Sequence, residues 1–181
     1  METSHKSIGG GVLIAVLKSL HSSQLDVDTK NREELWVQII VPGFNLTVCA
    51  TYIPPKSPGD LYQAHCELME SIVQQQPDSL ICVLGDFNLP QIKWDPAEED
   101  TGLSPTCLNR ECDISFCDSY IFSGFKQFNS YANTSGSILD LVLSNFDDAI
   151  CNINSDPIIK ADNLHPALDV SFPGIQLPSC N

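Results

Sequence analysis

The segment that most constrains the fold runs from Leu80 to Pro90 and reads LICVLGDFNLP. Its first five residues are continuously apolar, as expected of a strand that is covered on both faces. Gly85 then leads to Asp86 and Asn88, whose period-two spacing points both side chains to one side if the strand geometry continues. A carboxylate suits Mg²⁺, and a neutral amide can hold a phosphate oxygen without adding repulsive charge. The same residues are ordinary turn formers, so the segment alone leaves an Asx turn and a metal site open.

The acidic composition narrows the class of protein. The chain has 181 residues, 43% of them hydrophobic, which is enough for one domain with a sizeable core. Its formal net charge is −14, and its nine Lys and Arg residues are scattered from Lys6 to Lys160. This counts against nucleic-acid binding by phosphate neutralisation alone, which needs several cations on one face. It does not exclude a metal-dependent nuclease, whose centre is itself acidic.

The N-terminal region carries no targeting pattern. The apolar run from Gly11 to Leu17 is far too short to span a bilayer, and residues 1–10 lack the basic and apolar regions of a signal peptide. We therefore expect an intracellular protein without a secretion signal or a membrane partner. Its eight cysteines are then expected to be reduced thiols rather than a disulfide framework.

Strand and helix patterns alternate without a strict βαβ order, which favours a sheet sandwich flanked by helices. Three β-rich runs open the chain, with Pro42-Gly43 as a hairpin turn between the last two. The runs are Gly11 to Lys18, Glu34 to Val41 and Asn45 to Tyr52. The later segments are a helix from Asp60 to Gln75, a surface loop over 90–105, a short helix over 108–121, a strand from Ile138 to Ser144 and an edge strand from Ala167 to Phe172. Asp60 is suited to cap the first helix.

Two further residues stand in positions that point to chemistry. Asp140 interrupts an apolar strand, so its charge must be paired, hydrogen-bonded or metal-bound. A structural ion pair and a functional site are both open for it. His165 lies just before the last predicted strand, where it could contact a substrate or be a satisfied surface or core residue.

The order of these motifs is more specific than any one of them. The motifs are GGGVLIAV at 9–16, TYIPP at 51–55, GDFNLP at 85–90, LDLV at 139–142 and DNLH at 162–165. Together, and with Trp94 after GDFNLP, they resemble the endonuclease/exonuclease/phosphatase (DNase I-like) family over Gly9 to Phe172. The resemblance is closest to the endonuclease domain of insect-type non-LTR retrotransposons. It implies a four-layer αββα sandwich over 9–172, with an N-terminal extension at 1–8 and a tail at 173–181.

The resemblance implies a role for each matching side chain. Asp86 orients or deprotonates the attacking water, and Asn88 holds the scissile phosphate. Tyr52 contacts that phosphate through its hydroxyl. Asp140 orients His165, which stabilises charge on the phosphoryl oxygens. Independently, an anionic phosphodiester repels a nucleophile, so its cleavage needs a metal and hydrogen-bond donors at the developing charge.

The same resemblance implies a metal site and a DNA contact. Mg²⁺ or Mn²⁺ would be held by Asp86, Asn88 and Asp162, and Asn133 would contact DNA where many relatives carry a small hydroxyl residue. Asn163 and Leu164 separate Asp162 from His165, whereas relatives commonly place this aspartate and histidine side by side.

The implied function is Mg²⁺-dependent nicking of DNA. Nothing around Glu2 resembles the strand that presents the family's metal-binding glutamate, so we expect a domain truncated at its N-terminus, with impaired activity. The alternatives are a catalytically dead remnant or binding module of the same fold, and a phosphatase acting on small phosphorylated molecules. The expected partner is DNA as substrate. The chain would be a monomer or part of a longer polyprotein with a reverse transcriptase, and it would act in the nucleus.

Overall fold

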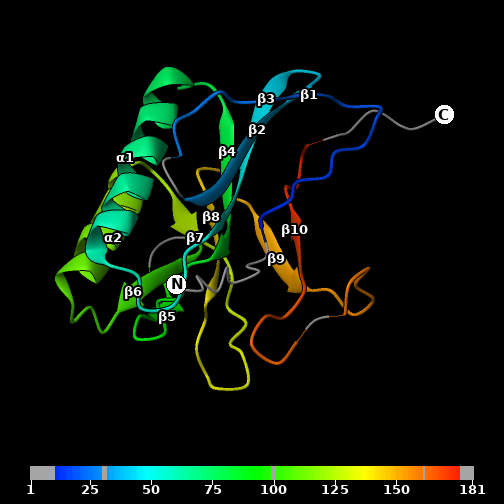
Figure 1. Ribbon diagram of the computed structural model, residues 1–181. Helices are drawn as coiled ribbons and strands as arrows, with labels where there is room; N and C mark the ends of the chain where they lie inside the picture. Colours follow the sequence, from blue (N-terminus) through cyan, green and yellow to red (C-terminus); the bar gives the residue numbers. More distant parts are fainter. Residues whose placement is uncertain (1–10, 30–31, 99–100, 161, 176–181) are drawn as a thin grey trace, which may run out of the picture.

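The computed structural model describes residues 11–29, 32–98, 101–160 and 162–175. In these ranges the chain forms two sheets and two helices (Figure 1). The larger sheet contains β1 (His21–Gln24), β2 (Glu33–Val41), β3 (Phe44–Tyr52), β4 (Leu80–Asp86), β5 (Lys93–Pro96), β6 (Leu103–Thr106), β7 (Lys126–Gln127) and β8 (Asp140–Ser144). The smaller sheet contains β9 (Ile150–Ile153) and β10 (Leu168–Ser171), and the helices are α1 (Gly59–Gln75) and α2 (Glu111–Phe122).

One parallel pair organises the larger sheet. Its strand order is β1-β2-β3-β4-β8-β7-β6-β5, and every pairing except that of β3 with β4 is antiparallel. A parallel pair needs a crossover connection, which α1 supplies between β3 and β4. As a result, the carboxyl ends of β3 and β4 lie at the same edge of the sheet, where the antiparallel neighbour β8 begins.

The molecule is layered. Both helices cover one face of the larger sheet, and the two-stranded sheet lies on its other side (Figure 1). The core between helices and sheet is rich in large aromatic and aliphatic side chains, including Trp36, Met69, Phe87, Phe116, Tyr120 and Leu143. The predicted sheet sandwich flanked by helices is confirmed, and the described residues supply its α, β and β layers. Neither described helix is both long and apolar enough to cross a membrane.

Local sequence explains the β2–β3 hairpin and α1. The hairpin turns at Pro42-Gly43, with Val41 paired to Phe44 and a left-handed φ of +93° at Gly43. The face of α1 that packs on the sheet consists of Tyr62, His65, Cys66, Met69 and Ile72.

The prediction that Asp60 caps α1 is wrong. The N-cap is Pro58, which makes no side-chain capping bond, and Asp60 lies in the first turn. Proline has a φ suited to a helix start, and a carboxylate in the first turn still complements the helix dipole.

The predicted strand from Gly11 to Lys18 is also wrong, because residues 11–17 have no regular secondary structure and are not paired in a sheet. Ile14 and Val16 pack with Val37 and Ile39 on a second cluster beside β2 and β3, while Leu13 is 84% exposed. The alternating apolar residues that predicted a strand therefore mark the half-buried side of this segment. The segment packs on the cluster without joining a hydrogen-bonded strand ladder. The edge strand β1 follows a few residues later.

The prediction of a surface loop over 90–105 is wrong at residues 93–96 and 103–105, which belong to strands β5 and β6. β5 and β6 pair as an antiparallel hairpin, with Trp94 opposite Pro105. Trp94 is 9% exposed, and its ring centroid lies 6.1 Å from that of Tyr120. The aromatic contact therefore anchors a segment whose composition predicts only turns. The predicted segment at 99–100 lies outside the described residues.

Gly85 gives a test of the β3–β4 pairing. A Cβ atom on Gly85 would lie 1.9 Å from the carbonyl oxygen of Thr51, so the two strands could not keep their spacing. We expect Gly85→Ala to lower the free energy of unfolding by about 3 kcal/mol, measured by urea denaturation. Gly11→Ala is the control, since nothing lies within 4 Å of the Cβ it would add. Equal stability of the two variants would contradict this account.

Candidate active site

Three predicted residues meet where β3, β4 and β8 lie side by side. Tyr52 at the end of β3 is opposite Asp86 at the end of β4, and Asp86 is opposite Asp140 at the start of β8. Residues that are paired across neighbouring strands point to the same face. The register therefore brings a phenol and two half-buried carboxylates together at one sheet edge.

His165 approaches this edge from the loop between β9 and β10. Its Nδ1 lies 3.0 and 3.1 Å from the two carboxylate oxygens of Asp140. Its Nε2 lies 3.8 Å from Oδ2 of Asp86. The Oδ1 atom of Asp162 accepts hydrogen bonds from the backbone N–H groups of Leu164, at 2.7 Å, and His165, at 2.8 Å. The exposed Asp162 thus shapes the turn that presents His165.

Asn88 is hydrogen-bonded to Asp86 twice. Oδ1 of Asp86 accepts from the Asn88 backbone N–H at 3.0 Å, and Oδ2 accepts from Asn88 Nδ2 at 2.7 Å. Nδ2 also donates to the carbonyl oxygen of Ile53 at 2.9 Å. Asn88 has a φ of +50°, a left-handed conformation that asparagine tolerates well. The Asx turn and the candidate site are therefore the same structure. Asn88 Nδ2 already donates two hydrogen bonds, so it must give up one of them before it can hold a phosphate.

The charges of the cluster influence one another. Burial raises the pKa of Asp86 and of Asp140, and His165 partly offsets this in both cases. Burial alone would lower the pKa of His165, but the hydrogen bond that His165 donates to Asp140 and the charges of Asp140 and Asp86 raise this pKa above its usual value. The arrangement favours an imidazolium beside the two carboxylates.

The donor set fits a hard divalent cation. Ligand atoms of Asp86, Asp140 and His165 lie within 4.8 Å of one another, in the part of the chain that the structure describes. Two crowded, half-buried carboxylates gain from a nearby cation, and oxygen donors suit Mg²⁺ or Mn²⁺. Asp140 is engaged with His165, so Asp86 is the carboxylate best placed to hold the ion. Asp162 lies outside this cluster, and its metal role, like that of Asn88, stays a prediction.

Asn133 lies in a turn that is tied to the His165 loop. Its Oδ1 accepts from the backbone N–H groups of Ser135, at 2.9 Å, and Ser137, at 3.1 Å. The next residue, Thr134, donates to the carbonyl oxygen of Asn163 from its backbone, at 3.1 Å, and from its hydroxyl, at 3.0 Å. The Asn133 side chain therefore shapes a turn beside the site, and its contact with DNA stays a prediction.

Asn129 supports the site but carries no sequence signal. It is fully buried, its Nδ2 donates to the carbonyl oxygen of Asp140 at 2.6 Å, and its Oδ1 accepts from the Tyr131 N–H at 2.9 Å. These bonds fix the start of β8, where Asp140 lies. Asparagine is common in loops, so only the fold reveals this function.

A buried charged cluster lies behind the site on its helix side. Glu34 accepts from Arg32 Nε at 2.9 Å, Trp36 Nε1 at 2.6 Å and His65 Nδ1 at 3.1 Å. The side chains of Glu34 and His65 are both fully buried, and the His65 ring lies 5.4 Å from that of Phe87. The sequence did not lead us to predict a role for either residue. Glu34 carries a signal similar to that of Asp140, since it is a carboxylate next to apolar strand residues.

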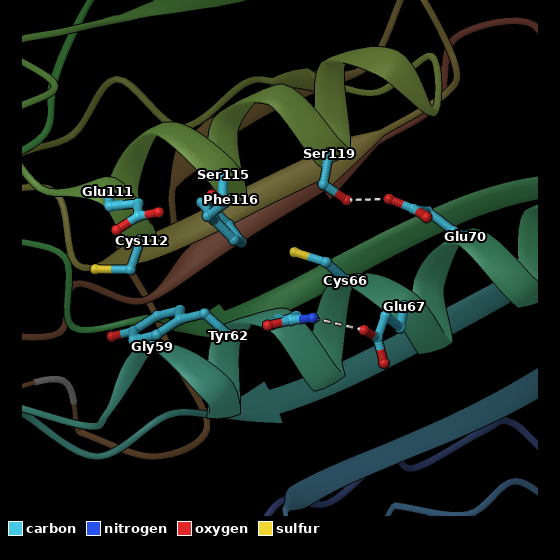
Figure 2. Close-up of a pocket in the computed structure, with 11 residues that line it drawn as sticks. Gly59, Tyr62, Cys66, Glu67, Glu70, Glu111, Cys112, Ser115, Phe116 and Ser119 are labelled. Atoms are coloured by element: carbon cyan, nitrogen blue, oxygen red, sulfur yellow. Dashed lines mark hydrogen bonds between the residues drawn. The ribbon is translucent and has the colours of Figure 1, made fainter.

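A separate cavity of about 550 Å³ opens between α1 and α2 (Figure 2). Its lining includes Cys66, Cys112 and three glutamates. Two of the glutamates are hydrogen-bonded within it, Glu67 to Gln63 at 2.9 Å and Glu70 to Ser119 at 2.6 Å. None of the candidate catalytic residues lines this cavity.

The fold and the clustered Asp, Asn and His side chains define the class of DNase I-like hydrolase folds. A family model described as "Endonuclease-reverse transcriptase" matches residues 46–164, more than half of the chain, and the chain belongs to this family. Within the wider grouping it is an endonuclease/exonuclease/phosphatase fold, as the resemblance implied. Among curated proteins, no sequence matches the chain.

One solved structure, an endonuclease domain, shows the same fold. The endonuclease domain of TRAS1, a telomere-specific non-LTR retrotransposon, superposes with a TM-score of 0.61 at 14% identity, covering 86% of this chain and 70% of that domain. Truncated TDP2 of Caenorhabditis elegans gives 0.46 at 13% identity, covering 86% and 68%. Beta toxin of Staphylococcus aureus with bound magnesium ions gives 0.46 at 10% identity, covering 78% and 55%. This chain therefore spans about half to seven tenths of the length of these structures.

The Glu34 cluster predicts a pH-dependent contribution to stability. Burial raises the pKa of Glu34, but bonds from His65, Arg32 and Trp36 outweigh it and hold the pKa below its ordinary value of 4.5. The stabilisation is therefore present above pH 4.5 and is lost as the pH falls through the lowered pKa. We expect Glu34→Gln to cost about 3 kcal/mol of unfolding free energy at pH 7, because it leaves buried partners unpaired.

Denaturation of both proteins at a series of pH values measures this effect. The difference between Glu34→Gln and the wild type should shrink towards low pH. Glu67→Gln is the control, since Glu67 is exposed on α1. A difference that stays constant down to the acid transition would contradict the ionised state of Glu34.

Proposed function

We propose that the protein hydrolyses phosphodiester bonds in a Mg²⁺- or Mn²⁺-dependent reaction and nicks DNA as a retrotransposon-type endonuclease. The observation that carries the proposal is the contact of His165 Nδ1 with both oxygens of Asp140, at 3.0 and 3.1 Å, beside Asp86. A carboxylate–imidazole pair next to a second carboxylate suits cleavage of an anionic ester.

Each side chain has a task that its position allows. Asp86, whose pKa is raised by burial, orients the attacking water and accepts its proton. His165 donates from Nε2 to a phosphoryl oxygen, while Asp140 holds the ring and keeps it charged. Tyr52, opposite Asp86 on β3, offers its hydroxyl to the phosphate. Asn88 positions Asp86 and exchanges a bond to the phosphate when substrate binds.

Asp86 would hold the metal ion, with Asn88 and Asp162 as further ligands. When bound, the ion neutralises charge on the phosphate and polarises its oxygens. His165 contacts the phosphate rather than the metal ion. Its Nδ1 is hydrogen-bonded to Asp140, so only Nε2 is turned toward Asp86 and the phosphate.

The DNA substrate is supported by the family and by the TRAS1 endonuclease fold. In that setting the chain would be joined to a reverse transcriptase in a longer polyprotein and would act in the nucleus. The net charge of −14 favours instead a small phosphorylated substrate or a catalytically dead binding module, since the nine Lys and Arg residues are scattered along the sequence rather than clustered. Cleavage of phosphomonoesters without cleavage of DNA would identify the phosphatase.

Plasmid nicking tests the proposal. We expect the purified chain to convert supercoiled plasmid to the open circle in Mg²⁺, and Asp86→Ala to slow this about 100-fold or more. Asp78→Ala is the matched control, since Asp78 is exposed near the opposite end of β4. Absence of nicking, or nicking that Asp86→Ala leaves unchanged, would refute the proposed activity. A Mg²⁺-dependent rise in melting temperature, absent from Asp86→Ala, would argue against a dead remnant.

The Asp140–His165 pair predicts the alkaline side of the pH profile. His165 acts in its charged form, so activity is present below its raised pKa and lost above it. Asp140→Asn removes the negative charge that helps to raise this pKa and leaves only a neutral hydrogen-bond acceptor, so the alkaline limb of kcat/KM should move to lower pH. Asp78→Asn should leave it in place. An alkaline limb that does not move in Asp140→Asn would exclude His165 as the titrating acid.

A further inference from the structure

Phe87 connects the candidate site to the helix layer. It lies between Asp86 and Asn88, and its own side chain is fully buried in the core. Its backbone N–H donates to the carbonyl oxygen of Leu139 at 2.9 Å, which is the last sheet-like bond before the chain turns at Asn88. Any shift of Phe87 therefore moves both of its polar neighbours.

Tyr62 of α1 holds the backbone of Phe87. Its hydroxyl donates to the Phe87 carbonyl oxygen at 2.8 Å, and the residue is 2% exposed. Burial raises the pKa of Tyr62 to about 12, so the hydroxyl keeps the proton that it donates. This carbonyl belongs to the peptide that leads into the left-handed turn at Asn88. The bond thus restrains the orientation of that peptide plane.

His65, one helical turn further along α1, holds the side chain of Phe87. The two rings meet edge to face with centroids 5.4 Å apart and an interplanar angle of 78°. His65 is itself fixed by Glu34, at 3.1 Å from Nδ1. The Phe87 ring also packs against Phe116 of α2, with centroids 5.2 Å apart, and Figure 2 shows Phe116 across from Tyr62. Phe87 is therefore held from α1 through both its backbone and its ring.

We propose that Tyr62 and His65 are positioning residues of the hydrolytic site, which set the geometry of Asp86 and Asn88 through Phe87. This inference rests on the proposed function. Neither residue touches the substrate or the metal. They hold the turn in the form in which Asn88 Nδ2 reaches Asp86 Oδ2 and the carboxylate faces His165.

The chain offers a matched pair of variants. Tyr62 and Tyr120 lie in the same core, are 2% and 1% exposed, and both contact Phe116. The Tyr120 hydroxyl has no hydrogen-bond partner among the described residues, so Tyr120→Phe removes an oxygen but no bond. Tyr62→Phe removes the bond to Phe87 and little else.

We expect Tyr62→Phe to lower kcat for plasmid nicking about 10-fold with KM unchanged, and to weaken Mg²⁺ binding measured by calorimetry in the absence of DNA. The side-chain amide resonances of Asn88 in the metal-free protein should shift. Tyr120→Phe should do none of these. Equal effects of the two variants, or a lowered melting temperature of Tyr62→Phe with normal kcat, Mg²⁺ affinity and Asn88 resonances, would overturn the proposal.

His65→Asn tests the second contact. An asparagine amide can replace Nδ1 as a donor to Glu34 but removes the ring edge from Phe87. We expect the same direction of change in kcat, Mg²⁺ affinity and Asn88 resonances, and unchanged values would remove His65 from the proposal. If the wild type does not nick DNA, the proposed activity fails. The Asn88 resonances of Tyr62→Phe then still decide whether the turn is positioned from α1.

Discussion

The parallel pairing of β3 with β4 is the interaction on which the rest of the structure depends. It requires the crossover helix α1, and it places the carboxyl ends of both strands at one edge of the sheet. The strands approach so closely at Thr51 and Gly85 that no side chain fits on Gly85. Antiparallel addition of β8 then completes a row of Tyr52, Asp86 and Asp140.

Electrostatics divides the candidate site into two parts. Asp140 is committed to His165, and this pair favours the charged imidazole. Asp86 is hydrogen-bonded to Asn88, and its carboxylate could still hold a cation. The chain has a net charge of −14, so in the proposed function phosphate binding at this edge would depend on His165 and on a metal ion rather than on a surrounding basic surface.

A second set of buried polar groups lies between α1 and the larger sheet. Glu34, His65 and Tyr62 all lie beneath the turn that bears the catalytic candidates, and each contacts Phe87 or a residue that does. A buried carboxylate is costly unless it is fully paired, and Glu34 accepts bonds from three side chains. In the proposed positioning role, this cluster would restrict the turn to one geometry, which a metal site requires of its ligands.

The sequence by itself determined most of the local elements and singled out the candidate residues that the structure brings together at one edge of the sheet. Apolar runs and turn residues gave the β2–β3 hairpin, α1, β4 and β8, because these signals depend only on neighbouring residues. Sequence periodicity and motifs alone gave the wrong secondary structure for residues 11–18 and for the β5–β6 hairpin. There the structure depends on packing against distant side chains such as Tyr120. Only the tertiary structure decided the strand register, the reach of His165 to Asp140 and the support from α1, because these contacts join residues that are far apart in the chain.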